Sequence, residues 1–124
     1  MADDPLPRLR ALCITLPGTT ERLSHGEPTW FVRGRKTFVM YADRHHDDRL
    51  AFWCAAPAGM QTPLLQQHPD HLFLPPYVGG RGWVGVRLDG PGLDWGLVED
   101  LVDDAYRTVA PRALVALLDA AVPE

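Results

Sequence analysis

Apolar residues recur at helical spacing near the N-terminus of the chain. They are Leu6, Leu9, Leu12, Cys13 and Leu16. This spacing predicts an amphipathic helix. It would begin at Asp4-Pro5, an N-cap followed by proline at the first helical position, and stop at Pro17-Gly18. Thr19 to Glu21 is expected to form a short further turn that reaches Leu23.

A second helical pattern occupies the C-terminal third. Asp94 is the predicted N-cap, and the residues that follow it separate into an apolar stripe and an acidic row. The stripe consists of Trp95, Val98, Leu101, Val102, Ala105 and Tyr106, and the row of Glu99, Asp100, Asp103 and Asp104. Ala110-Pro111 interrupts the pattern. Leu114, Leu117, Leu118 and Ala121 then predict a last short helix.

Between these helices the pattern is that of strands. Residues 29–32 and 37–41 are β-branched and aromatic and flank a polar, glycine-containing turn, which predicts a β-hairpin. The remaining expected elements are strands at 50–55, 72–74 and 83–88 and a short helix at 60–67. This order predicts an α+β fold, a single compact domain over residues 1–124. We expect an antiparallel β-sheet of about four to five strands with helices packed on one face.

Composition narrows the class of protein. The chain has 124 residues and is 46% hydrophobic, yet no apolar run approaches the roughly 20 residues that span a bilayer. The acidic N-terminus argues against a secretory signal. Cys13 and Cys54 are too few for a disulfide framework, so we expect two buried thiols in a cytoplasmic protein. A monomer is the expected oligomeric state.

Charge is unevenly distributed along the chain. The formal net charge is −4, which does not favour binding to nucleic acid, but residues 22–87 carry a net +3 and residues 88–124 a net −6. Such asymmetry permits a local surface that faces an anionic partner.

Glycine, aromatic residues and arginine are concentrated in the glycine-rich stretch at 75–88. It holds four glycines, two aromatic residues and two arginines in 14 positions. Arg81 and Trp83 together offer a phosphate contact and a stacking face, the combination found in single-strand binders, and Tyr77 is considered in the same way. The alternatives are a tight structural connection, with Trp83 in the core, or a wall of a ligand cleft.

The hairpin turn at 33–36 offers three cations and no local acid. Arg33, Arg35 and Lys36 would each add affinity for a polyanion by releasing counterions from phosphates. The alternative is an ordinary solvated hairpin tip, where basic residues discourage edge-to-edge aggregation.

The sequence gives weaker signals for a metal site or a catalytic site than for the basic residues. His45-His46-Asp47-Asp48 resembles a ligand cluster by composition, but its spacing selects no geometry, and a solvated loop is the favoured interpretation. The acidic row at 99–104 is interpreted as the solvated face of its helix. His25 has no partner that the sequence identifies. No nucleotide-binding, hydrolase or zinc-protease motif is present. We therefore predict no enzyme, no cofactor and no metal.

Several segments in the same order resemble the MmcQ/YjbR-like family of small bacterial proteins. They are Leu16-Pro17-Gly18-Thr19-Thr20-Glu21, Pro28-Thr29-Trp30-Phe31-Val32, Lys36-Thr37-Phe38-Val39, Pro76-Tyr77-Val78-Gly79-Gly80-Arg81-Gly82-Trp83-Val84, Leu101-Val102-Asp103-Asp104-Ala105-Tyr106 and Ala110-Pro111-Arg112. The resemblance covers nearly the whole chain. It implies an α+β fold similar to that of bacterial frataxin (YjbR/CyaY-like). It also implies binding to DNA through a "double wing" of β-hairpins.

The sequence thus favours a non-enzymatic protein that binds DNA weakly and without sequence preference. Phosphate contacts would come from Arg33, Arg35, Lys36 and Arg81, and stacking surfaces from Trp83 or Tyr77. The alternative is a protein-interaction or small-ligand-binding module with a cleft at residues 77–83. One continuous basic surface across the 33–36 turn and Arg81 would favour DNA, and apolar walls beneath Arg81 would favour the ligand module.

Overall fold

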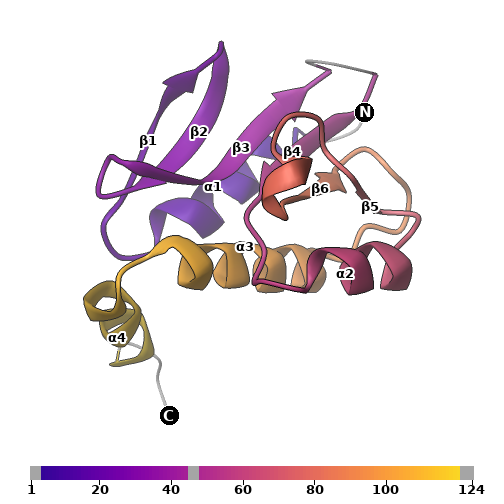
Figure 1. Cartoon of the computed structure of the whole chain (residues 1–124). Helices are drawn as coiled ribbons and strands as arrows, with labels where there is room; N and C mark the ends of the chain where they lie inside the picture. The colour runs from indigo at the N-terminus through magenta and orange to yellow at the C-terminus, as the bar shows by residue number, and fades with distance from the viewer. Residues whose placement is uncertain (1–3, 45–47, 121–124) are drawn as a thin grey trace.

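The computed structural model describes residues 4–44 and 48–120 and forms an α+β fold, as expected (Figure 1). Its elements in chain order are α1 (Leu6–Ile14), β1 (Thr19–Ser24), β2 (Glu27–Val32), β3 (Lys36–Asp43), β4 (Leu50–Cys54), α2 (Gln61–Gln67), β5 (Leu72–Phe73), the 3-10 turn η1 (Gly79–Arg81), β6 (Val84–Arg87), α3 (Trp95–Val109) and α4 (Arg112–Ala120). Within the described ranges, no helix combines the length and apolar character needed to cross a membrane.

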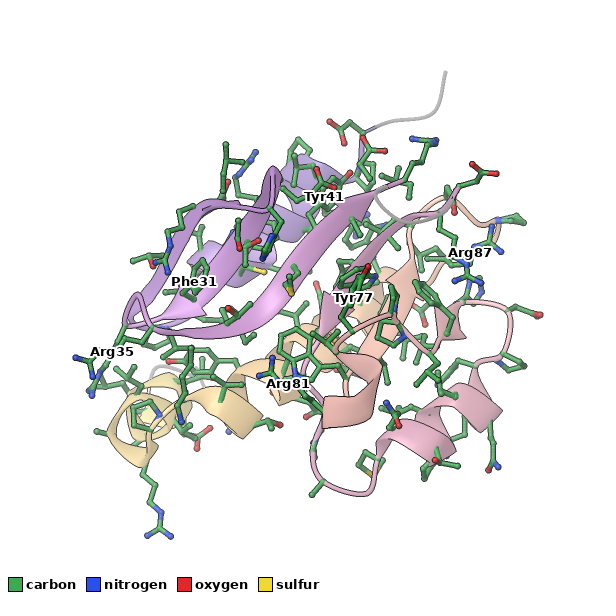
Figure 2. All side chains as sticks on the ribbon, turned by 45° about the horizontal axis from the view of Figure 1, so that its top comes forward. Phe31, Arg35, Tyr41, Tyr77, Arg81 and Arg87 are labelled. Atoms are coloured by element: carbon green, nitrogen blue, oxygen red, sulfur yellow. The ribbon has the colours of Figure 1, made fainter. Side chains whose placement is uncertain are left out.

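The strands form one antiparallel sheet in the order β1-β2-β3-β4-β6-β5, so the sheet has six strands rather than four or five. Helices α1 and α3 pack on one face of it (Figure 1). The contacts include the edge-to-face pair of Phe38 and Tyr106, whose ring centroids lie 5.8 Å apart. We call the opposite side the open face. The segment that carries η1 crosses it (Figure 2).

The extra strand is β1, where the sequence predicted a short helical turn. Residues 19–24 pair with β2 from Thr19 opposite Val32 to Ser24 opposite Glu27. The connection is a two-residue turn in which His25 and Gly26 both have positive φ, 53° and 81°. Turns of this kind match the right-handed twist of a hairpin. Tertiary pairing and the His-Gly turn therefore decide the conformation of this segment.

Helix α3 follows its predicted pattern closely. Asp94 caps it by accepting a hydrogen bond from the backbone N–H of Gly96 at 2.8 Å. All members of the predicted stripe beyond Trp95 are buried. Tyr106 also donates from its hydroxyl to the Pro17 carbonyl, which links the helix to the end of α1. The apolar period thus fixed both the type of element and the face it buries.

Strand β3 contains a bulge that sets which side chains reach the open face. Phe31 lies opposite Thr37 and Trp30 opposite Val39, so Phe38 is an extra residue in the ladder. Phe38 and Val39 are both fully buried among the helices. As a result, Thr37 lies on the open face together with the next residue after the bulge, Met40.

A partly exposed ion pair connects α1 to the sheet. Arg10 on α1 donates two hydrogen bonds, at 2.8 and 3.0 Å, to the Glu21 carboxylate, which also accepts one from the indole Nε1 of Trp30 at 3.0 Å. Trp30 is fully buried, so its N–H has no access to water. Glu21→Ala is expected to lower the free energy of unfolding by about 2 kcal/mol, because it leaves that donor buried without an acceptor. Urea denaturation measures the change.

Glu21→Gln is the matched control, since it keeps an acceptor and removes only the charge. The hydrogen bond from Arg10 lowers the pKa of Glu21 below its ordinary 4.5. The ionised pair therefore contributes stability above pH 4.5, and that contribution is lost as the pH falls through the folded-state pKa. The difference in stability between wild type and Glu21→Gln should shrink below pH 4.5. A difference that grows in acid would contradict this assignment.

Candidate nucleic-acid interface

The tip of the β2–β3 hairpin presents the three cations singled out in the sequence. Arg33 and Gly34 turn the chain with φ of 55° and 67°, and the Arg35 N–H donates to the Val32 carbonyl at 3.1 Å. Arg33, Arg35 and Lys36 are all exposed. The short, hydrogen-bonded turn holds their backbone while the charged ends reach solvent.

The glycine-rich stretch forms η1, whose last residue is Arg81. Gly82 then takes φ of 86°, a conformation that favours glycine, and the chain enters β6. The Gln61 side chain fixes both ends of this turn, because its Nε2 donates to the carbonyls of Gly79 and Trp83, each at 2.7 Å. A turn held by side-chain hydrogen bonds therefore positions Arg81.

Trp83 is not available as a stacking surface. Its side chain is only 4% exposed, and the guanidinium carbon of Arg81 lies 5.2 Å from its ring centroid. Such a cation–π contact orients the arginine. Trp83 is thus a core residue that supports Arg81, the alternative considered from the sequence.

The hairpin tip and Arg81 border the same depression, of about 450 Å³, which we call the cationic hollow. Its lining residues are Arg35, Lys36, Thr37, Ala55, Ala56, Arg81, Trp83, Thr108 and Val109. Among the described residues, this lining contains three cations and no carboxylate. Arg33 lines an adjacent depression of about 420 Å³ together with Arg35 and Lys36. In Figure 2, Arg35 marks the hairpin tip and Arg81 the crossing segment.

A second depression, of about 560 Å³, lies on the other side of Arg81, between the open face and the crossing segment. We call it the aromatic cavity. It is lined by Ser24, His25, Glu27, Thr37, Met40, Tyr41, Trp53, Tyr77, Val78 and Arg81. The predicted cleft at residues 77–83 therefore has a counterpart here. Its floor was not predicted, because only tertiary pairing places Met40 opposite Trp53.

Tyr77 has an exposed aromatic side chain and an unfavourable backbone conformation. Its side chain is 78% exposed, and its backbone has φ of 62°. A bulky residue rarely adopts this left-handed conformation, which costs roughly 1–2 kcal/mol. Strained residues of this kind concentrate at functional sites. Tyr77 is thus the aromatic residue of the stretch that a ligand can reach (Figure 2).

The backbone strain at Tyr77 can be measured with two substitutions. Tyr77→Ala and Tyr77→Gly both remove the ring, but only glycine relaxes at positive φ. We expect the glycine variant to exceed the alanine variant in free energy of unfolding by about 1 kcal/mol. Parallel urea denaturation curves measure this difference. An alanine variant as stable as the glycine variant would contradict the strain.

The described residues offer little other chemistry. Cys13 and Cys54 are free and buried, and burial raises the pKa of Cys54 to about 12, so its thiol stays protonated at neutral pH. No group of three or more potential metal ligands occurs within residues 4–44 and 48–120. Of the histidine cluster considered above, residues 45–47 lie outside the described ranges. His25 is a turn residue that lines the aromatic cavity.

Comparison with known proteins gives a family and a fold. A family model described as YjbR matches residues 14–108. The crystal structure of Deinococcus radiodurans protein DR2400, with a domain described as DUF419, superposes with a TM-score of 0.72. That protein is 19% identical, and the match covers 92% of this chain and 87% of the other. The likeness concerns the fold alone. No curated protein matches the chain.

Proposed function

The chain belongs to the YjbR family, and we propose that it is a cytoplasmic, non-enzymatic protein that binds DNA through phosphate contacts. The observation that carries the proposal is the cationic hollow. Arg35, Lys36 and Arg81 come from segments more than forty positions apart in the sequence, yet they line one depression without a carboxylate among its described residues. A cluster of this kind attracts a phosphate backbone by counterion release.

Two features indicate how strong and how sequence-specific the binding to DNA would be. The charged side chains that line the hollow are those of arginine and lysine, and phosphate contacts carry no direct information on base sequence. The net charge of −4 opposes long-range attraction to a polyanion. These phosphate contacts by themselves therefore predict weak, sequence-tolerant binding by a monomer.

Fluorescence anisotropy with labelled single-stranded and duplex DNA of the same sequence tests the proposal. Binding should be measurable at about 50 mM salt and should weaken steeply by about 200 mM, as phosphate contacts require. A mixed-sequence and a homopolymeric duplex should bind alike. Absence of binding at the lower salt concentration would refute the proposal.

A further inference from the structure

The aromatic cavity and the cationic hollow share Arg81 and Thr37, so a ligand can occupy both at once. We infer that the aromatic cavity receives one unstacked nucleobase of a single strand whose phosphate lies in the cationic hollow. This inference rests on the proposed function and adds a preference for single-stranded nucleic acid. A base inside a duplex is stacked on both faces and paired at its edge, so it would first have to be unpaired and extruded before it could enter a cavity.

The walls of the cavity suit a flat aromatic ligand. Met40 and Trp53 are cross-strand partners on the open face and form the floor, while Tyr77 and Val78 contribute from the crossing segment. The volume of about 560 Å³ falls within the range of small-ligand sites. Bases stack on such side chains irrespective of sequence, because every base has a π-face.

The polar groups of the cavity lie on the β1–β2 turn. Ser24, His25 and Glu27 line the cavity there. Glu27 begins β2, whereas the basic tip follows the end of the same strand, so the carboxylate and the tip cations lie at opposite ends of β2. Glu27 Oε2 accepts a hydrogen bond from the Asp43 N–H at 2.5 Å, which restrains the carboxylate.

That arrangement predicts which base edge is preferred. A carboxylate accepts from an exocyclic amino group, as on cytosine, and finds no such donor on thymine. In this orientation the phosphate would pair with Arg81, and the amino group of the base would donate a hydrogen bond to Glu27. Cytosine should therefore bind better than thymine, a comparison in which ring size stays the same.

The strained, exposed Tyr77 supports the same assignment. A left-handed backbone is unfavourable for a tyrosine, and strained residues of this kind concentrate at functional sites. A tyrosine held in this way over a cavity provides the second face against which a base can stack. Its substitution removes ligand contacts while the core of the domain stays intact.

The test compares single-stranded and duplex DNA by anisotropy at one low salt concentration. Wild-type protein should bind the single strand about tenfold or more tightly than the duplex, and Tyr77→Ala should remove most of that advantage, leaving duplex affinity and salt dependence unchanged. Met40→Trp, which fills the cavity from its floor, should act in the same way. Leu23→Ala is the control, because Leu23 is 71% exposed and adjoins Ser24 but does not line the cavity.

A second arm uses oligo-dC and oligo-dT of equal length. Oligo-dC should bind more tightly, and Glu27→Ala should bring the two affinities together. Equal affinity of wild type for the two strands would overturn the role of Glu27. Deoxycytidine monophosphate is then tested as a competitor of the bound oligonucleotide. If it competes as well as the unlabelled oligonucleotide does, the ligand is a free nucleotide, and the assignment of a single strand is overturned.

The outcomes separate this inference from the function on which it rests. Salt-dependent binding that is equal for single strand and duplex, and insensitive to Tyr77→Ala, would overturn the base cavity and leave the phosphate contacts standing. Loss of all binding at low salt would overturn both.

Discussion

Replacing Arg35, Lys36 and Arg81 together by alanine is expected to weaken DNA binding on the order of 100-fold at low salt. The three side chains line the cationic hollow and supply its positive charge. Each lost phosphate contact should also lower the slope of log affinity against log salt concentration by roughly 0.7–0.9. A decrease of about 2–3 in that slope is therefore the more specific result. Anisotropy titrations over a series of salt concentrations measure both quantities.

The control has to separate local contacts from total charge. Neutralising Arg8, Arg44 and Arg87 removes the same number of cations, and none of these residues lines the cationic hollow. This variant should keep an affinity within about threefold of wild type, since only long-range attraction changes. Equal losses in the two triple variants would show that net charge, and not the hollow, governs binding.

Phe38→Ala is expected to produce the largest loss of stability, about 4 kcal/mol. Phe38 is fully buried, and its ring meets Tyr106 edge to face, so truncation leaves a cavity between the sheet and α3. A loss of this size is a large part of the stability of an ordinary small domain. Chemical denaturation monitored by circular dichroism measures it.

Two companion variants define the cause of that loss. Phe38→Leu retains most of the apolar volume and should cost about 1–1.5 kcal/mol. Leu117→Ala on α4, where the side chain is 58% exposed, should change stability by less than about 0.5 kcal/mol. If Phe38→Ala cost no more than Phe38→Leu, the space would close without a cavity, contrary to this assignment.

Most elements were predictable because their signals are local. The stripe and cap of α3 depend on a period within one helix, and the β2–β3 hairpin on two apolar runs around a glycine turn. Strand β1 was missed because its residues alternate weakly in burial, and only pairing with β2 makes them extended. The family resemblance was confirmed by the match to the YjbR model.

The candidate site was predictable in its residue types and only partly in its arrangement. Exposed basic residues at a hairpin turn can be identified from sequence. That Arg81 borders the same hollow depends on the path of the crossing segment over the sheet. The exposures of Tyr77 and Trp83 differ for the same reason, since residues six positions apart in an irregular segment follow no period. The sheet floor under Tyr77 depends on strand register, which the sequence alone does not fix.

The bulge at Phe38 has a consequence for how this chain can vary in length. The extra residue sets the orientation of the basic tip relative to Met40, which lies beyond it on the same strand. Losing or gaining one residue between the tip and Met40 would shift the alternation by one and turn the two towards opposite faces of the sheet. Substitutions, in contrast, leave the alternation of side chains between the two faces unchanged. Natural variation in this segment should therefore consist of substitutions, with insertions and deletions confined to other connections of the domain.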